Sequence, residues 1–415
     1  MVAGISRVSR FGPGRRLVLG LLLALVASFA PPRTQAAKKP KPPYTYYALG
    51  SPEIQPSIGQ ARPTPSYALM GGGPDVDEAF RWMIQRAGIA PGTGGRLVVI
   101  RATGDDAYNP YIFYSGKKSS TSTDWKDGWV GGASLGLTSV ETLVIPSTQA
   151  ADDPEVNRIV ARANAVWIAG GDQSHYLRFW KGHMLERTLA ALMTMNVPIG
   201  GTSAGLAVLG GFDFAALNGT VTSVQAMSNP YNPFMTIDPT DPDDVSGTTL
   251  SRSGGFIAPP VFANVIFDSH LDSRDRMGRL VSFVSRLVET TSGAGQSYGC
   301  TGGVLGSGVA RGVGIGVETA LLVAGREHGG KPGYSARRVT NISTTSESAV
   351  YFVSLIQSPT VCREGAPLSV PSSSVVIHKL ADSDREIDFE TLAGLPDVYR
   401  YTGVSAGVLD DPNPY

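Results

Sequence analysis

The sequence predicts an α/β fold with a mainly parallel, doubly wound sheet and helices on both of its faces. Three observations support this prediction. Short apolar runs alternate with segments of helical periodicity, glycine is abundant at 50 residues, and glycines follow directly where predicted strands end. Strands that alternate with helices form βαβ units, and such units place their strands parallel in one sheet.

Composition sets the broad class of protein. The chain has 415 residues, of which 42% are hydrophobic, so a large core is available and global disorder is excluded. The 35 basic and 35 acidic side chains give a net charge of zero, which argues against a nucleic-acid-binding protein.

The predicted elements begin at residue 66 and alternate along the chain. The first strand, residues 66–70, is a short apolar run that ends at three glycines. A helix follows at residues 75–87, where apolar residues recur at helical spacing and Gly88 caps the end. The next predicted elements are strands at 96–100 and 140–146, a helix at 154–163, a strand at 165–169, a helix at 185–195 and a short strand at 197–199.

The second half of the chain is richer in strands. After a strand at 264–267, residues 276–290 form a clearly amphipathic helix, and the later strands are expected to add antiparallel edges. These later strands are predicted at 314–317, 319–323, 350–355 and 375–379. Long insertions at about 105–135 and 210–260 interrupt the pattern, and loops of this length usually wall a functional site or bind a partner.

The N-terminal segment has the pattern of an export signal. Four arginines within residues 7–16 precede an apolar run at 17–30, and residues 34–36 offer a small-residue cleavage site. The run is short for a membrane span. We therefore expect residues 1–36 to be removed, leaving a secreted or periplasmic protein with no stable membrane span; an uncleaved anchor is the alternative.

The remaining boundaries follow from composition. Residues 37–65 are crowded with proline and are expected to be a linker, residues 66–395 the folded domain, and residues 396–415 a C-terminal tail. In an oxidising compartment Cys300 and Cys362 could form a disulfide, with two free thiols as the alternative.

A candidate nucleophile lies between a predicted strand and a helix. Residues Gly201-Thr202-Ser203-Ala204-Gly205 match the pattern G-x-S-x-G, and a serine on so tight a turn exposes its hydroxyl beside the start of the helix. The backbone N–H of Ala204 can then face the oxyanion that forms after attack. The alternative is a glycine-rich helix start that Ser203 merely caps.

A nucleophilic serine needs a base, and His270 is the candidate among five histidines. It ends the strand at 264–267, and ligands of doubly wound sheets bind outside the carboxyl ends of the strands, where Ser203 also lies. The alternative base is His175. Arg274, Arg276 and Arg279 follow and are either an anion-binding surface or an exposed charged turn.

Together with Gly170-Gly171-Asp172-Gln173, these motifs resemble those of the cyanophycinases, from about Tyr67 to about Thr391. Cyanophycinases are serine peptidases related to the aspartyl dipeptidases and built on a class I glutamine-amidotransferase-like scaffold. The resemblance implies hydrolysis of cyanophycin, a polyaspartate with arginine on each side-chain carboxylate, to β-Asp-Arg dipeptides.

The resemblance also implies roles for individual residues. Ser203 resembles the nucleophile, His270 the base and Glu318 the acid that orients the histidine. Gly171 and Ala204 resemble the two oxyanion-hole donors. The residues that resemble a substrate-binding set are Gln173, Asp268, Arg274, Arg276 and Arg279.

The motifs depart from the family pattern in three places. Ser269 replaces a common amide before the histidine, Asp275 replaces a glycine between two arginines, and the sequence around Glu318 is shorter than the family pattern. The expected partner is cyanophycin or an Asp-Arg peptide, with no cofactor, metal or nucleic acid, and a homodimer is left open. The alternatives are a related serine dipeptidase or amidase for Asp-containing peptides, and a non-catalytic binding protein of the same fold.

Overall fold

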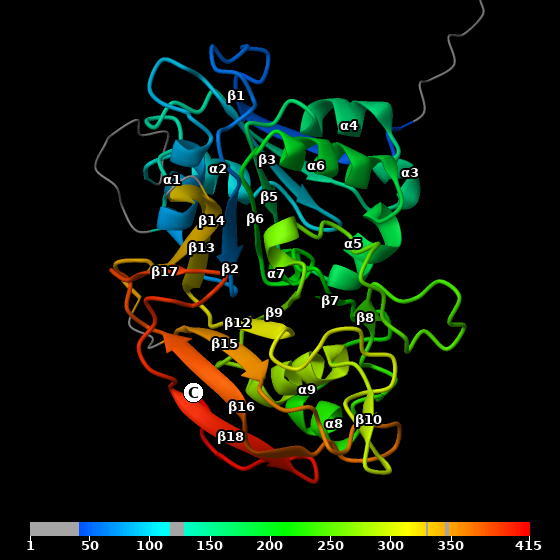
Figure 1. Cartoon of the computed structure of the whole chain (residues 1–415). Helices are drawn as coiled ribbons and strands as arrows, with labels where there is room; N and C mark the ends of the chain where they lie inside the picture. The colour runs from blue at the N-terminus through cyan, green and yellow to red at the C-terminus, as the bar shows by residue number, and fades with distance from the viewer. Residues whose placement is uncertain (1–40, 117–127, 329–330, 345–347) are drawn as a thin grey trace, which may run out of the picture. The chain divides into compact units, whose positions relative to one another are not determined.

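Five parallel strands form the centre of the larger of two main sheets (Figure 1). In the computed structural model they pair in the order β4-β3-β5-β6-β2. Their bounds are β2 (Ser66–Met70), β3 (Arg96–Arg101), β4 (Ser139–Val144), β5 (Ala165–Ile168) and β6 (Ile199–Thr202). This part of the sheet confirms the parallel arrangement expected from alternating strands and helices.

The structure describes residues 41–116, 128–328, 331–344 and 348–415. Apart from Lys41, these residues belong to one compact unit, Pro42–Tyr415. The expected export signal, residues 1–36, lies outside the described residues, as do residues 37–40 of the expected linker. Within the described residues no helix is long and apolar enough to cross a membrane.

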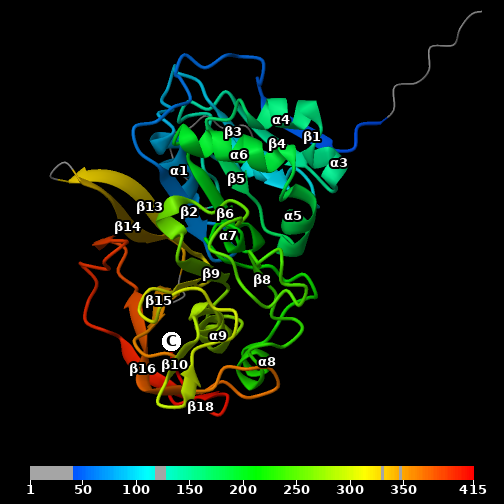
Figure 2. The ribbon, with the colours of Figure 1, turned by 45° about the vertical axis from the view of Figure 1, so that its right-hand side comes forward.

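Antiparallel strands extend both edges of this sheet to nine strands. They are β1 (Thr45–Gly50) beside β4, and β13 (Thr319–His328), β14 (Lys331–Thr340) and β17 (Glu386–Asp388) beyond β2. Figure 2 shows the β13–β14 hairpin running outward from the sheet. The expectation of a mainly parallel sheet is therefore wrong outside the five central strands.

A second, mostly antiparallel sheet has the order β19-β18-β16-β15-β12-β9. Its strands are β9 (Val265–Ser269), β12 (Arg311–Ile315), β15 (Val350–Leu355), β16 (Val370–Leu380), β18 (Arg400–Ser405) and β19 (Val408–Leu409). Only the β9–β12 pair in it is parallel. Two small pairs complete the described strands, namely β7 (Asp213–Phe214) with β8 (Ile237–Asp238) and β10 (Thr291–Gly293) with β11 (Gln296–Tyr298).

Helices cover both faces of the larger sheet because side chains alternate along its strands. Val98 and Ile100 belong to one core cluster, with residues of the helices α3 to α6, whereas Leu97 and Val99 belong to another, with residues of α1 and α2. The helices are α1 (Asp77–Arg86), α2 (Tyr108–Phe113), α3 (Thr148–Ala151), α4 (Pro154–Val160), α5 (Gln173–Trp180), α6 (Met184–Thr194), α7 (Ala204–Ala207), α8 (Ser223–Ser228), the 3₁₀ turn η1 (Pro260–Phe262) and α9 (Met277–Leu287).

The amphipathic helix α9 packs on the second sheet through a glycine-lined strand. A Cβ at Gly312 of β12 would lie 2.7 Å from Val284, and one at Gly314 would lie 2.6 Å from Leu271. These two glycines thus let the helix, and the turn before it, approach the sheet closely.

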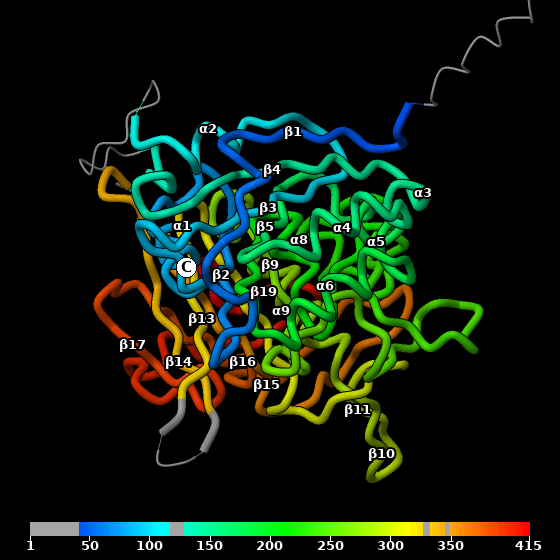
Figure 3. The backbone as a smooth tube through the Cα atoms, turned by 90° about the horizontal axis from the view of Figure 1, so that it is seen from above, coloured from blue at the N-terminus to red at the C-terminus, as the bar shows by residue number. Residues whose placement is uncertain are grey.

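The expected linker and tail both contribute strands. Residues 45–50 hold no proline, so their N–H groups are free to pair with β4, and Figure 3 shows β1 along that edge. At the other end, β18 pairs with β16, so residues 396–415 are not a detached tail. Cys300 and Cys362 form a disulfide that spans 62 residues, which resolves the alternative left open by the sequence.

Candidate active site

Ser203 stands on a strained turn between β6 and α7. Its φ is 53° and its ψ is −113°, a combination that non-glycine residues rarely adopt. The flanking glycines make the turn possible, because a Cβ at Gly201 would lie 2.4 Å from the carbonyl oxygen of Gly205, and a Cβ at Gly205 would lie 2.1 Å from that of Ile168. The hydroxyl is thereby presented at the carboxyl end of β6, as in a nucleophile elbow.

His270 meets this hydroxyl from the other sheet. Its Nε2 lies 2.9 Å from Ser203 Oγ, and it follows β9, so the two residues come from strands of different sheets rather than from one sheet as expected. Burial, and next the positive charges of Arg274 and Arg276, lower the pKa of His270 from 6.5 to about 4. The imidazole is therefore neutral at neutral pH and able to accept the hydroxyl proton.

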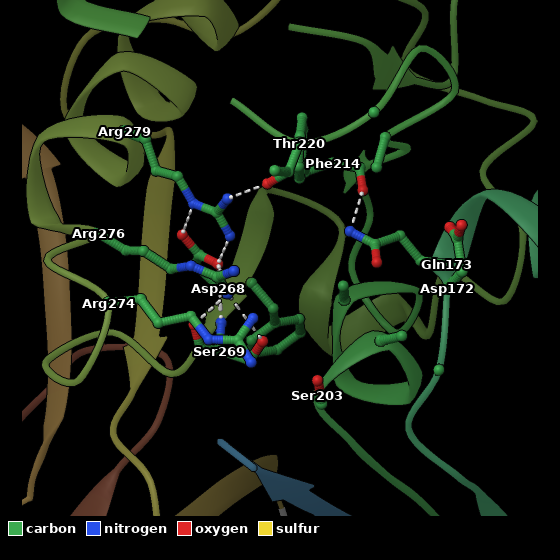
Figure 4. A pocket seen from close by; sticks show the side chains of 16 residues that line it. Asp172, Gln173, Ser203, Phe214, Thr220, Asp268, Ser269, Arg274, Arg276 and Arg279 are labelled. Atoms are coloured by element: carbon green, nitrogen blue, oxygen red, sulfur yellow. Dashed lines mark hydrogen bonds and ion pairs between the residues drawn. The ribbon is translucent and has the colours of Figure 1, made fainter. Parts of the chain in front are cut away.

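A cavity of about 280 Å³ opens beside Ser203. Figure 4 shows Asp268 and the three arginines along one wall, with Ser203 and Gln173 across from them. Every residue of the expected substrate-binding set and both expected oxyanion donors line this cavity; these are Gly171, Gln173, Ala204, Asp268, Arg274, Arg276 and Arg279.

Asp268 and Arg279 form a buried two-point ion pair. Arg279 Nε donates to Asp268 Oδ2 at 2.7 Å and Nη2 donates to Oδ1 at 2.5 Å, and each residue is only 3% exposed. Arg279 Nη1 also donates to Thr220 Oγ1 and to the carbonyl of Val221, both at 3.1 Å. Most of the hydrogen-bonding groups of these two wall residues are thus already used within the protein, and their expected direct contact with substrate stays a prediction.

Arg276 and Arg274 remain as the cations that face the open cavity. Arg276 Nη1 donates to the carbonyl of Ser269 at 2.8 Å and lies 3.6 Å from Asp268 Oδ1, while Arg274 is exposed. Burial is the main cause that lowers the pKa of Arg276 to about 10, so it stays charged at neutral pH. Since Arg279 already offsets Asp268, the wall has an excess of positive charge and suits a carboxylate.

Gln173, Gly171 and Ala204 form the opposite side of the cavity. Gln173 begins α5 and donates through Nε2 to the carbonyl of Phe214 at 3.3 Å, while Asp172 caps the helix by accepting from Ser174 N. A Cβ at Gly170 would lie 3.5 Å from Ser203 Cβ, so the Gly170-Gly171 turn lies against the nucleophile. Gly171 and Ala204 both line the cavity together with Ser203, and their role as oxyanion donors stays a prediction.

Glu318 is linked to Gly72, the residue that lies against His270, by a backbone hydrogen bond. It lies on the turn between β12 and β13 with φ 53°, and its N–H donates to the carbonyl of Gly72 at 3.0 Å. Among the hydrogen bonds of the described residues, none joins its carboxylate to His270. Its role as the orienting acid stays a prediction.

Gly72 lies against the candidate base, and the sequence interpretation missed it. It has φ +128°, and a Cβ there would lie 2.2 Å from Cε1 of His270, so its bare Cα forms the seat of the imidazole ring. The three consecutive glycines after the first predicted strand were the available signal.

Three other histidines, His175, His183 and His378, do not line the cavity. His175, the alternative base, does not line the cavity, and its ring stacks on Phe179 at 5.2 Å within α5. His183 precedes α6 and contacts Asp152 Oδ2 at 2.7 Å, and His378 lies in β16. Of the two bases that the sequence allowed, the structure brings His270 to Ser203.

Comparison with known proteins adds little to this geometry. No family profile matches the sequence, and no curated protein sequence matches it. Similar solved structures include a peptidase from an acI-B1 actinobacterium, with TM-score 0.39 and 15% identity over 84% of this chain and 98% of that one. Another is a candidate peptidase E from Listeria monocytogenes, with TM-score 0.34 and 13% identity over 67% of this chain and 100% of that one. Both carry peptidase names, but at these scores they assign neither a family nor an activity to this chain.

Proposed function

We propose that this protein is a serine peptidase that hydrolyses carboxylate-rich peptides, with cyanophycin as its substrate. The observation that carries the proposal is the 2.9 Å contact between Ser203 Oγ and His270 Nε2 beside an arginine-lined cavity. A serine and a neutral imidazole at this distance form the pair that acyl transfer requires.

The chemistry follows from this pair. His270 Nε2 accepts the proton of Ser203 as Oγ forms a bond to the scissile carbonyl carbon, and the resulting oxyanion accepts hydrogen bonds from Gly171 and Ala204. The imidazolium then protonates the leaving amine as the C–N bond breaks, which leaves an ester on Ser203. Water, deprotonated by His270, releases the acid product and restores the serine.

The substrate class follows from the charge of the cavity wall. Arg274 and Arg276 face the cavity with an excess of positive charge, and cyanophycin presents carboxylates along its length. Arginine binds a carboxylate through two parallel hydrogen bonds, which would orient the peptide bond over Ser203. An Asp-containing dipeptide would satisfy the same arginines, so the related dipeptidase is the alternative.

The test is incubation of the purified mature protein with cyanophycin and, separately, with α-linked Asp dipeptides, followed by product mass. Release of β-Asp-Arg from the polymer supports the proposal. Cleavage of the dipeptides alone would favour the dipeptidase, and no cleavage of either would favour a non-catalytic binding protein. A serine-directed phosphonate that fails to label Ser203 would contradict the serine mechanism itself.

We further propose that the protein is exported. The signal pattern in residues 1–36 is the basis, and the Cys300–Cys362 disulfide is compatible with an oxidising compartment. N-terminal sequencing of the cell-derived protein should find a start close to Ala37, whereas a start at Met1 or Val2 would contradict cleavage.

A further inference from the structure

Tyr415, the last residue of the sequence, reaches the turn that precedes α9. Its hydroxyl accepts a hydrogen bond from the backbone N–H of Met277 at 2.9 Å and donates one to Asp275 Oδ1 at 3.0 Å. The Met277 amide is the first of α9, so it has no acceptor within the helix. A phenol can donate and accept at once, and Tyr415 uses both abilities on this one turn.

The phenol is held in place by its own contacts. Its ring packs edge-on against Tyr351 at a centroid distance of 6.0 Å, and its main-chain oxygen accepts from the hydroxyl of Tyr399 at 2.6 Å. Burial raises the pKa of Tyr415 above its ordinary value, so the hydroxyl keeps its proton at neutral pH. The donor to Asp275 is therefore always present under working conditions.

The turn that Tyr415 holds is the one that carries the cavity arginines. Asp275 sits between Arg274 and Arg276 with φ 47°, a left-handed conformation that aspartate adopts only at some cost. On the far side of the turn, Ser223 Oγ donates to the carbonyl of Asp275 and accepts from the N–H of Arg279 at 3.1 Å. The strained turn is thus clamped between a serine on α8 and the phenol of Tyr415.

We infer that Tyr415 is a positioning residue, whose hydroxyl fixes the turn so that Arg274 and Arg276 face the cavity and bind the carboxylate of the substrate. The inference rests on the proposed function for its substrate. His270 begins this turn, since the N–H of Arg274 donates to its carbonyl at 3.2 Å, but its own N–H also donates to the carbonyl of Gly71 at 2.7 Å. Because of this second contact, we expect the Ser203–His270 contact to persist without the Tyr415 hydroxyl.

The test compares Tyr415→Phe with Tyr46→Phe, which removes one phenol hydroxyl from a hydrogen bond to Glu141 on the β1 edge, away from the cavity. If a displaced arginine loses one hydrogen bond to a charged group, Tyr415→Phe should raise KM for the carboxylate-bearing substrate about tenfold. The value of kcat, and the hydrolysis of a small uncharged activated ester, should stay at the wild-type level. Tyr46→Phe should change neither substrate's kinetics.

A measurement without substrate completes the test. Hydrogen exchange of the Met277 amide should be faster in Tyr415→Phe than in the wild type and unchanged in Tyr46→Phe. Unaltered exchange, or equal losses on the peptide and the ester, would overturn the inference. If the wild type cleaves neither cyanophycin nor an Asp peptide, the proposed function fails, while the exchange measurement still decides whether Tyr415 holds the turn.

Discussion

Ser203 and His270 are hydrogen-bonded through their backbone N–H groups to the carbonyl groups of two consecutive residues, Met70 and Gly71. The N–H of Ser203 donates to the carbonyl of Met70 at 3.1 Å, and the N–H of His270 donates to the carbonyl of Gly71 at 2.7 Å. Both residues have positive φ, 53° and 49°, which costs about 1–3 kcal/mol each where the surroundings enforce it. The end of β2 therefore sets the distance between the candidate nucleophile and the candidate base, which are 67 residues apart.

Replacement of Ser203 should abolish hydrolysis without unfolding the protein. In Ser203→Ala the methyl group occupies less space than the hydroxymethyl group, and only the nucleophile is lost. We expect kcat to fall by about 10⁴-fold or more, as in serine peptidases that lose their nucleophile. Steady-state kinetics and circular dichroism check the two halves of this prediction. A rate close to wild type would require a different nucleophile.

The pH dependence of kcat/KM, which reports the free enzyme, should differ from that of kcat, which reports the substrate complex. Burial and the neighbouring arginines lower the pKa of His270 to about 4, and the base works only when neutral. The acid limb of kcat/KM should therefore lie near pH 4 rather than near 6.5. A bound carboxylate offsets the charge of Arg274 and Arg276, which raises the pKa of His270, so the acid limb of kcat should lie at higher pH.

An uncharged ester serves as the control for this profile, since it leaves both arginines unpaired. Its two acid limbs should coincide. A kcat/KM limb near pH 6.5 for the free enzyme would contradict the predicted effect of burial and of the arginines.

The sequence predicted which residues meet at this site better than it predicted the sheets that bring them together. Ser203 and His270 were identifiable because a G-x-S-x-G turn and a histidine at a strand end are local patterns. The split of their strands between two sheets was not, because a short strand carries no local signal of the sheet it joins, and its pairing partners depend on distant residues. The same limit explains why β1 and β18 were expected to be linker and tail.

The sequence indicated that charged residues line the cavity wall, but it did not indicate which of them form ion pairs with each other. Asp268 and Arg279 lie eleven residues apart, and their hydrogen bonds to each other depend on how α9 packs beside β9. Tyr415 could not be linked to the site at all, because its contacts join segments about 140 residues apart.

Substitution of Arg279 should lower the stability of the protein, whereas substitution of Arg274 should leave its stability nearly unchanged. Arg279→Ala leaves the buried carboxylate of Asp268 without its main partner, and breaking a buried ion pair in this way costs about 3–5 kcal/mol of unfolding free energy. Arg274 is exposed, so Arg274→Ala should change stability by less than about 0.5 kcal/mol. Urea denaturation of the two variants measures this difference.

The kinetics of the stable variant, Arg274→Ala, then test whether the exposed arginine binds substrate. Arg274→Ala should lower kcat/KM on cyanophycin about ten- to a hundredfold, because one charged hydrogen bond is lost, and leave the small ester unchanged. Equal losses on both substrates would mean that Arg274 shapes the turn rather than binds the substrate.

Substitutions of the glycines after β2 test whether the position of the His270 ring is required for activity. Gly72→Ala would place a methyl group 2.2 Å from Cε1 of His270, at a φ of +128° that alanine rarely adopts, so the ring must move away from Ser203. At the adjacent Gly73 the nearest atom to an added Cβ is the backbone N of Asp75 at 3.6 Å, an ordinary contact. We therefore expect Gly72→Ala to lower kcat by about 10²-fold or more, as a displacement of about 1 Å can do, while Gly73→Ala stays near the wild-type rate. Labelling of Ser203 by a phosphonate should slow in parallel in the first variant only. Full activity in Gly72→Ala would show that the ring position seen here is not the one that catalysis uses.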